Sequence, residues 1–439
     1  MTANRLMANR RASTTTRRRF LQSVATALAA PTILPARLRG ANAPSKQIAV
    51  GFIGMGDHGV SRNLMTFLEQ PDARAVAVCD VFRSRREDAK RIVDVTYQNK
   101  DCRVYADFRE MLARPDIDAI MISTPDHWHA VMSAMALRAG KDVICEKPTL
   151  TIADGRFIAD LVKKSGRVFQ TSTEDRSLRV YHQLAEIVRD GRIGRLQRIE
   201  VSLPTGTDYP DESEVPVPED LDYDLWLGPA SVAPFTPERT ERMRWRHILD
   251  YSGGMLSDWG MHQLDTAQWA NDTERTGPVE VKGTGRAKEN SQYNAYRTFD
   301  LEYRYANGVV LHVKDGGTGI QCHGSDGWVG SPSWNTDLTA SRPEIIKEPF
   351  GANDQRLFTC PQGEHRNFLD CIKSRGEPYF PAEIGHRCAT LCHLGNIALQ
   401  TGRTLRWDPE KEVFPDDPEA NASRFRSRPL RAPWSREMT

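Results

Sequence analysis

The chain has 439 residues, which is too long for one ordinary domain, so we expect two folded domains. Hydrophobic residues make up 39% of the chain and charged residues 27%, a profile typical of a globular protein. The 59 Lys and Arg residues almost balance the 58 Asp and Glu residues, which leaves a formal net charge of +1. This balance produces no strong overall field, so neither nucleic acid nor an anionic membrane is expected as a partner.

The N-terminal segment differs in composition from the rest of the chain. It is rich in arginine, has no acidic residue before Gln22, and is followed by a mildly apolar run from Ser23 to Leu34. Paired arginines before Phe20 and a weakly apolar run resemble a twin-arginine export signal, although a disordered basic tail is the alternative. We assign residues 1–45 to a signal and linker and expect a periplasmic or otherwise exported protein, with no membrane contact after export.

Residues 46–170 alternate between apolar strands and helices. The strands are expected at 48–53, 73–79, 119–122, 142–145 and 168–170, and the helices at 60–68, 83–96, 108–113, 129–139 and 152–165. Strands without polar alternation, separated by helices, indicate a parallel sheet that is covered on both faces. The fold class is therefore α/β, with a Rossmann dinucleotide-binding domain over residues 46–170.

Residues 171–439 show a different pattern, in which several strands alternate with period two. The expected strands lie at 196–203, 279–283, 299–305 and 309–313, and the expected helices at 180–190, 364–374 and 383–401. Asn307 and Gly308 between the last two strands are a strong hairpin signal. We predict a substrate-binding α+β domain with a mostly antiparallel, open-faced sheet and an irregular tail after Asp408. The open face is expected to form a homo-oligomer interface.

A glycine-rich segment follows the first predicted strand and opens the first predicted helix. It consists of Gly54, Met55, Gly56, Asp57, His58 and Gly59. In a dinucleotide-binding turn, the first glycine permits the tight turn, the second lets the backbone approach a pyrophosphate, and the third lets helix and strand pack closely. The helix N-terminus then offers free N–H groups to the phosphates. The segment therefore predicts a dinucleotide site.

Asp80 ends the second predicted strand, roughly 20 residues beyond the last glycine, as this fingerprint requires. A carboxylate at this position accepts hydrogen bonds from ribose hydroxyls and repels a 2′-phosphate, which favours NAD as the cofactor. Arg83 and Arg85 follow closely, so NADP is also possible.

Polar residues also follow two later strands of the predicted parallel sheet. Ser123 to His129 come after one strand, and Glu146, Lys147 and Pro148 end the next. Ligands bind at the carboxyl edge of open α/β sheets, so we expect further cofactor contacts there. The candidates are Thr124, Pro125, His129, Glu146, Lys147 and Gln170.

A third polar segment extends from Gly253 to Asp265. If it forms one helix, Asp258, His262 and Asp265 share a face at positions i, i+4 and i+7.

These motifs together resemble the Gfo/Idh/MocA family, which is named for glucose–fructose oxidoreductase and inositol dehydrogenase. The resemblance extends from about Gln47 to the C-terminal end, and the segments 124–129, 170–177 and 429–434 look like a bacterial exported subgroup. It implies that Lys147 contacts both the nicotinamide ribose and a substrate hydroxyl. It also implies that Lys147, Asp258 and His262 form the catalytic set.

The chemistry of alcohol oxidation supports these roles independently. A hydride moves to the nicotinamide and a proton is released, so a base must lie within hydrogen-bond reach of the hydroxyl. His262 can take this proton near neutral pH, and Asp258 can orient the imidazole or bind a neighbouring hydroxyl. Lys147 is expected to have a lowered pKa and to polarise or deprotonate the same oxygen. The sequence leaves open which of Lys147 and His262 is the base. The non-catalytic alternatives are a structural salt bridge between Glu146 and Lys147, and a His262 that only packs in the core.

Aromatic faces and bidentate donors suit sugars and polyols, which suggests further substrate contacts. The candidates are Trp128, Arg176, Trp245, Arg246, Tyr251 and Asp265. No metal site is expected, because Cys388, Cys392 and His393 lack further ligands at convincing spacing and are better explained by helix packing.

The leading functional hypothesis is an NAD(P)-dependent oxidoreductase that acts on a secondary hydroxyl of a sugar, polyol or sugar derivative. The alternatives are an NAD-dependent glycosidase that works by oxidation, elimination and reduction, and a non-catalytic carbohydrate-binding protein. Export adds one expectation, because the space outside the membrane has no dependable supply of free NAD. We therefore expect the cofactor to be loaded inside, held tightly and regenerated in a redox-neutral cycle.

Overall fold

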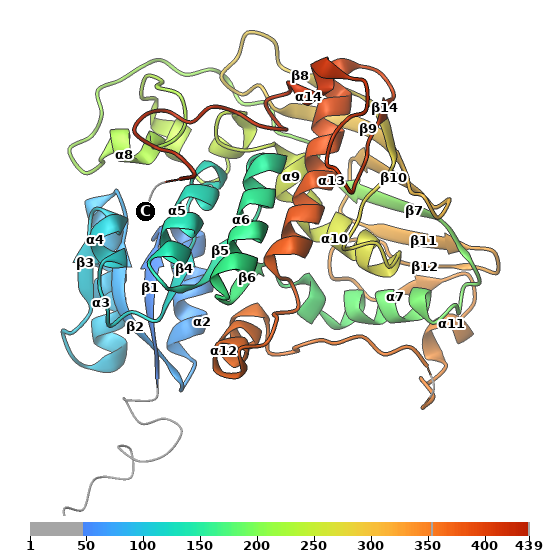
Figure 1. Ribbon diagram of the computed structural model, residues 1–439, viewed down its shortest axis with the longest axis horizontal. Coiled ribbons are helices and arrows are strands. Elements are labelled where there is room, and N and C mark those ends of the chain that lie inside the picture. Colours follow the sequence, from blue (N-terminus) through green and yellow to red (C-terminus); the bar gives the residue numbers. More distant parts are fainter. Residues whose placement is uncertain (1–46, 353, 438–439) are drawn as a thin grey trace, which may run out of the picture. The chain divides into compact units, whose positions relative to one another are not determined.

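The computed structural model describes residues 47–437 except residue 353. The signal and linker predicted for residues 1–45 lie outside the described residues, and the predicted export route stays a prediction. From Ile48 onward the chain forms one unit, in which two sheets lie side by side (Figure 1). In the described part of the chain, no helix has both the length and the apolar character needed to span a membrane.

The first sheet confirms the predicted parallel α/β half. Its strands are β1 (Ile48–Ile53), β2 (Ala73–Cys79), β3 (Arg103–Tyr105), β4 (Ala119–Ile122), β5 (Asp142–Glu146) and β6 (Phe169–Ser172). They pair in the order β3-β2-β1-β4-β5-β6, and all neighbours are parallel. The strand order reverses between β1 and β4, which is where ligands bind in such sheets. Strand β3 was not predicted, because its three residues are only partly buried and carry no apolar run.

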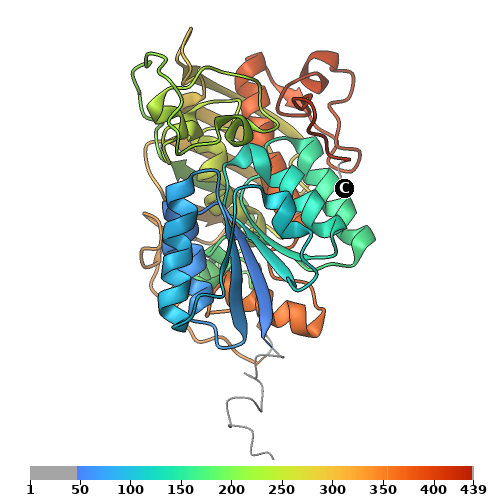
Figure 2. The ribbon, with the colours of Figure 1, turned by 90° about the vertical axis from the view of Figure 1, so that its left-hand side faces the viewer.

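Helices cover both faces of this sheet, as Figure 2 shows from the side. They are η3 (Gly59–Leu64) with α2 (Met65–Leu68), α3 (Arg83–Tyr97), α4 (Phe108–Leu112), α5 (Asp126–Arg138) and α6 (Ile152–Ser165). Helix α5 begins three residues before the predicted start at His129. Almost all of its residues are buried, so its sequence has no amphipathic periodicity that would mark the first turn. Asp126 thereby lies on the helix instead of in a preceding loop.

The second sheet confirms the predicted α+β half. Its strands are β7 (Leu196–Leu203), β8 (Glu280–Ala287), β9 (Tyr296–Arg304), β10 (Val310–Asp315), β11 (Ile320–Gly324), β12 (Trp328–Ser331), β13 (Thr339–Ala340) and β14 (Leu405–Arg406). The order is β13-β12-β11-β7-β10-β9-β8-β14, and only β7 and β10 pair in parallel. The predicted hairpin at Asn307 and Gly308 joins β9 and β10, with Gly308 at a φ of +87°.

Helices α7 (Arg179–Arg189), α10 (Gly260–Ala270) and α13 (Ala382–Thr401) pack on one face of this sheet. Alternate residues of the strands, such as Val201, Leu301 and Leu311, form the core beneath them. The opposite face carries ion pairs between charged side chains, including Lys282 with Glu302. This face is polar, and its predicted use as an oligomer interface stays a prediction.

The chain returns to the Rossmann half near its C-terminus. Helix α12 (Glu364–Ser374) contacts β5 and β6, and its Arg366 pairs with Asp72 at 2.8 Å. Helix α13 packs along α6 (Figure 1). The two halves are therefore joined by long-range packing as well as by the chain itself.

The tail beyond Asp408 is less irregular than its polar composition suggested. It contains the short helix α14 (Pro418–Asn421), and it buries Phe414, Phe425 and Trp434. The Trp434 ring lies 4.7 Å from the Trp128 ring, measured between centroids, and thus anchors the tail on α5. Widely spaced aromatic residues carry this packing, and a composition average does not reveal them.

Candidate active site

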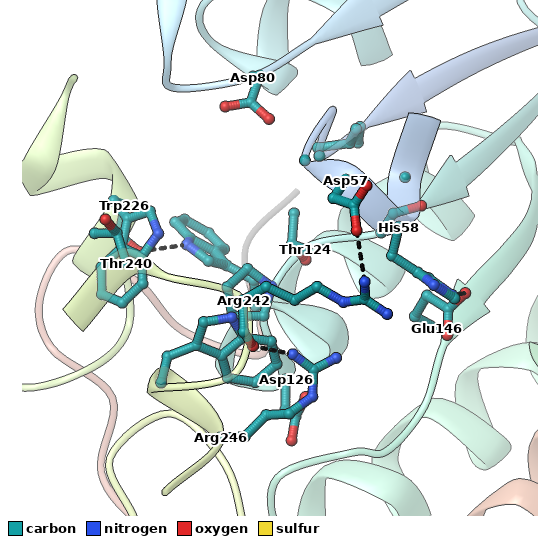
Figure 3. A pocket seen from close by; sticks show the side chains of 18 of the residues that line it. Asp57, His58, Asp80, Thr124, Asp126, Glu146, Trp226, Thr240, Arg242 and Arg246 are labelled. Atoms are coloured by element: carbon teal, nitrogen blue, oxygen red, sulfur yellow. Dashed lines mark hydrogen bonds and ion pairs between the residues drawn. The ribbon is translucent and has the colours of Figure 1, made fainter. Parts of the chain in front are cut away.

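A cavity of about 400 Å³ opens at the carboxyl ends of β1, β2, β4 and β5. Residues from both halves of the chain line it, and Figure 3 shows part of this lining. The cavity collects the glycine segment, Asp80, Lys147, Asp258 and His262 around one space. This placement follows from the topology, because the carboxyl ends of parallel strands meet at one edge of the sheet.

The three glycines of the first turn fit a bound pyrophosphate. Gly54 has a φ of +89°, and a Cβ atom there would lie 2.7 Å from the Ser123 carbonyl carbon. A Cβ atom on Gly59 would lie 2.0 Å from the Gly54 carbonyl oxygen, so only glycine allows this helix to approach the strand. Gly56 meets only the tip of Arg85, at 3.7 Å, so its backbone is open to the cavity. The turn thus leaves a cradle that side chains would fill.

Asp80 follows β2 directly and lies beside the glycine turn. Its Oδ2 accepts a hydrogen bond from the Met55 backbone N–H at 2.6 Å, and its Oδ1 accepts one from the Phe82 N–H at 2.8 Å. The Met55 side chain itself is buried, so the part that this residue plays at the site is the hydrogen bond from its backbone N–H to Asp80. Arg85 also lines the cavity and stacks over the Phe82 ring at 3.9 Å. Asp80 is thus fixed where the ribose of a dinucleotide would lie.

Lys147 follows β5 directly and pairs with a carboxylate from the second half of the chain. Its Nζ donates hydrogen bonds to the Asp258 carbonyl oxygen at 2.6 Å and to Asp258 Oδ1 at 2.8 Å. The two side chains are only 10% and 13% exposed. Arg246 Nε lies 3.2 Å from the other oxygen, Asp258 Oδ2. Asp258 therefore holds two cations at the edge of the cavity.

This pairing changes the expected protonation of Lys147. Burial alone would lower the pKa of the ammonium, but the carboxylates of Asp258 and Glu146 together raise this pKa above its ordinary value. Burial also disfavours the Asp258 anion, yet Lys147 and Arg246 hold the pKa of Asp258 well below its usual range. The predicted lowering of the Lys147 pKa is wrong, because motif spacing does not reveal which carboxylate the lysine meets.

Glu146 does not form the salt bridge with Lys147 that the sequence suggested as an alternative. Its Oε1 lies 3.1 Å from His58 Nε2 and accepts a hydrogen bond from Asn63 Nδ2 at 3.0 Å. Burial would raise the pKa of Glu146, but these contacts with His58 and Asn63 hold it well below its usual range. Glu146 therefore links the end of β5 to the glycine turn. Lys147 forms its ion pair with Asp258 instead.

His262 lies across the same cavity. The predicted single helix is broken at Trp259 into α9 (Met255–Asp258) and α10. The imidazole Nδ1 lies 3.0 Å from Asp175 Oδ2 and 3.2 Å from Thr173 Oγ1. Burial would lower the pKa of His262, but the carboxylates of Asp175 and Glu174 together raise it. The carboxylate that orients the imidazole is thus Asp175 instead of Asp258, which corrects the sequence-based assignment.

Asp175 was missed although it lies in a segment that the sequence singled out. It begins the short turn η4 (Asp175–Ser177) just after β6. Nothing in its local spacing relates it to His262, which lies 87 residues further along the chain. Only the packing of α10 against this turn brings the two residues together.

Two predicted substrate residues form a separate buried ion pair. Arg176 donates two hydrogen bonds to Asp265, at 2.8 and 2.7 Å, and a third to the Tyr379 carbonyl oxygen. Neither Arg176 nor Asp265 lines the cavity. Asp258 and Asp265 belong to the two separate helices α9 and α10, and of the two only Asp258 lines the cavity.

Three further predicted residues lie behind the lining. The ring nitrogens of His129 lie 2.7 Å from the Pro148 carbonyl oxygen and 2.8 Å from that of Thr124, so the ring joins the loops after β4 and β5. Gln170 is fully buried and donates to the Thr171 carbonyl oxygen. Tyr251 is also fully buried, and its hydroxyl accepts a hydrogen bond from Arg239.

The other predicted contacts do line the cavity. Thr124 and Pro125 lie on it near the glycine turn, and Trp245 and Arg246 lie on it near Asp258. Trp128 lines it as well, but only 2% of this residue is exposed. Its indole Nε1 donates to the Trp226 carbonyl oxygen at 3.0 Å, and its ring packs on Phe108 and Trp434. Trp128 is therefore mainly a packing residue under the floor of the cavity.

A long segment between β7 and α9 covers the cavity. This covering segment comprises residues 204–250 and includes α8 (Tyr223–Leu227), η5 (Pro237–Thr240) and η6 (Trp245–His247). Asp220 accepts hydrogen bonds from the Ser84 backbone N–H at 2.9 Å and from its hydroxyl at 2.5 Å. Arg242 reaches across to Asp57, with Nη1 2.5 Å from Oδ2 (Figure 3). The segment is thus attached to the Rossmann half at two places, at the start of α3 and at the glycine turn itself.

The fold and the cavity together define a dinucleotide-dependent oxidoreductase. The glycine cradle and Asp80 fit a dinucleotide, and a lysine, a histidine and their carboxylates stand in the same cavity.

Comparison with known proteins defines the family. Residues 48–173 match the NAD-binding Rossmann domain of an oxidoreductase family, and residues 181–436 match its C-terminal α/β domain. The chain therefore belongs to the Gfo/Idh/MocA oxidoreductase family, and it is an NAD(P)-dependent oxidoreductase of CH–OH donors with an NAD-binding domain.

Individual relatives are distant. An uncharacterized oxidoreductase, YrbE, from Bacillus subtilis is 25% identical over 377 residues, which cover 84% of this chain and 96% of the relative. A myo-inositol 2-dehydrogenase from Thermotoga maritima is 25% identical over 274 residues, covering 62% of this chain and 66% of the relative. The fold is similar to the WlbA dehydrogenase from Bordetella pertussis in complex with NADH and UDP-GlcNAcA. That likeness has a TM-score of 0.63 at 16% identity and covers 82% of this chain and 99% of the other.

The buried ion pair of Arg176 generates a stability prediction. Replacement Arg176→Met leaves the Asp265 carboxylate buried without its partner, so the free energy of unfolding should fall by about 3–5 kcal/mol. Arg179→Met removes an exposed arginine of α7 and should change it by less than about 0.5 kcal/mol. Urea unfolding measures both values. If the Arg176→Met protein is as stable as the wild type but binds sugar more weakly, Arg176 is a substrate-binding residue after all.

Proposed function

We propose that the protein uses NAD to oxidise a secondary hydroxyl of a sugar, polyol or sugar derivative. The observation that carries the proposal is the shared cavity, in which Lys147 and His262 line the same space as the glycine turn and Asp80. Relatives named as inositol dehydrogenases support a polyol or sugar as the substrate class. Export by the twin-arginine route remains part of the proposal.

The geometry suggests how the residues divide the work. When bound, NAD supplies the acceptor for the hydride that leaves the carbinol carbon. Lys147 stays protonated beside Asp258, so it donates a hydrogen bond to the substrate oxygen and stabilises the negative charge that develops there. It is therefore a poor candidate for the base.

His262 is the better base. Its Nδ1 faces Asp175, and its Nε2 has no hydrogen-bond partner among the described residues. The free Nε2 takes the hydroxyl proton, and the Asp175 carboxylate stabilises the imidazolium that results. The structure thus supports one acid–base residue and one charge-stabilising residue, each oriented by its own carboxylate.

The covering segment supports the expectation of a tightly held cofactor. It contributes to the lining through Trp226, Thr240, Arg242 and Trp245, among others, and its attachment to the Rossmann half encloses the glycine turn. Release of NAD then requires these contacts to open. A cofactor that stays bound between turnovers would suit a redox-neutral cycle, in which one sugar is oxidised and another is reduced.

The function is tested by hydride transfer in the purified, cofactor-loaded protein. Adding myo-inositol or D-glucose should produce bound NADH, which is detected by its absorbance. Lys147→Ala and His262→Ala should each lower the rate by about two to four orders of magnitude. Lys164→Ala, at the exposed end of α6, serves as the control. Release of an aglycone from an aryl glycoside, without net NADH from either sugar, would support the glycosidase hypothesis instead.

The Asp175–His262 pair predicts a specific pH dependence. Oxidation needs the neutral imidazole, so kcat/KM should rise with pH through the pKa of His262, which lies above its ordinary value of 6.5. Replacement Asp175→Asn removes the charge that raises this pKa, so the rise should move to lower pH and the maximal rate should fall about tenfold or more. A pH profile of both proteins measures this shift, with NAD affinity as the check on folding. An unmoved profile would argue against His262 as the base.

The Arg242–Asp57 pair predicts faster cofactor release when it is broken. The side chains are 52% and 65% exposed, so the pair contributes at most about 1 kcal/mol, and Arg242→Ala should speed NAD dissociation about two- to fivefold. Asp57→Asn should have the same effect, and the double variant should add little more. Stopped-flow dilution of the loaded protein measures the rates, with Arg286→Ala on β8 as the control. Strictly additive single effects would show that the two residues do not act as a pair.

A further inference from the structure

Asp126 is a buried carboxyl group of the cavity that has no part in the steps above. It occupies the first turn of α5, and only 4% of the residue is exposed. Its Oδ2 is buried and has no hydrogen-bond partner among the described residues. Figure 3 shows the side chain at the end of the cavity near Arg246. A buried polar atom without a partner beside a ligand cavity suggests that a ligand completes its bonding.

Burial and the surrounding charges determine whether the Asp126 carboxyl group is protonated or ionised. Burial raises the pKa of Asp126 to about 7. The Ser252 hydroxyl, which lies near Asp126 but does not meet the geometry of a hydrogen bond, lowers this pKa, as do the cations of Arg246 and Lys147. The Asp258 carboxylate raises it. The positive end of α5 also favours the anion.

The two nearby cations are already paired with the other carboxylate. Lys147 lies 2.8 Å and Arg246 lies 3.2 Å from oxygens of Asp258. No ion pair of Asp126 occurs in the described part of the chain. Both cations therefore stabilise the anion of Asp258, and Asp126 is the neutral acid below about pH 7.

We propose that Asp126 is a further substrate-binding residue, which acts as a carboxylic acid and donates a hydrogen bond from Oδ2 to a second oxygen of the substrate. This inference rests on the proposed function, because the first oxygen is the one that Lys147 and His262 serve. A simple secondary alcohol has no second oxygen and would leave the acid unpaired in the complex. Asp126 therefore selects polyols and sugars over monohydric alcohols.

The first test compares substrate binding across pH in the NAD-loaded holoenzyme. With myo-inositol or D-glucose as the substrate, the wild-type KM should rise as the pH increases above about 7, because the donor proton is lost. Asp126→Asn keeps a neutral donor of similar shape, so its KM should not show this rise. Asp126→Ala has no donor, and its KM should be about tenfold or more higher at every pH. The NAD dissociation constant should be the same in all three proteins, because Asp126 is assigned to the substrate.

The second test needs no substrate. An acid whose pKa is raised in the folded state destabilises that state as the pH increases from its unfolded pKa, about 4, to its folded pKa. Asp126→Asn should therefore gain melting temperature relative to the wild type by several degrees between pH 5 and pH 8. Asp88→Asn, which removes an exposed carboxylate of α3, should show no such change with pH.

The outcomes separate this inference from the proposed function. If the wild type transfers a hydride from a sugar but Asp126→Asn keeps the wild-type rise in KM, the inference is wrong and the proposed function stands. If neither sugar reduces the bound NAD, the proposed function fails, and the melting temperatures alone then decide whether Asp126 is a neutral acid. A difference in melting temperature that stays constant from pH 5 to pH 8 would overturn the acid assignment.

Discussion

The ion pair between Lys147 and Asp258 is the contact on which the site depends. It joins the end of β5 in the Rossmann half to α9 in the second half, and both side chains are nearly buried. A buried lysine without a partner would lose its proton or weaken the packing between the halves. With Asp258 beside it, the lysine keeps its charge and lies at the cavity. The same contact therefore positions the two halves and sets the chemistry of the lysine.

The remaining charges of the site follow from this pair. Because Lys147 stays protonated, a separate base is needed, and His262 with Asp175 provides it. Because Asp258 takes both nearby cations, Asp126 has none, and it stays protonated up to a pH of about 7. The cavity is lined by four of these ionisable groups, Lys147, Asp258, His262 and Asp126. The protonation of each group is set by its neighbours as well as by its residue type.

Much of the fold and part of the site could be predicted from the sequence, because those signals are local. The glycine turn, Asp80 and the lysine after β5 follow strands whose apolar runs are visible in the chain. The partners of these residues were not visible. Asp175 lies 87 residues before His262, and the Arg176–Asp265 pair was taken for a substrate contact. Tertiary packing decides these contacts, and motif spacing does not record it.

The central claim is that Lys147 and His262 act on one substrate hydroxyl above the nicotinamide. A crystal structure of the NAD-loaded protein with a bound polyol tests it most directly. The account predicts one hydroxyl oxygen within hydrogen-bond reach, about 2.6–3.2 Å, of both Lys147 Nζ and His262 Nε2, with its carbon facing the nicotinamide C4. A polyol bound with its hydroxyls away from either residue, while the cofactor occupies the cradle, would contradict the account.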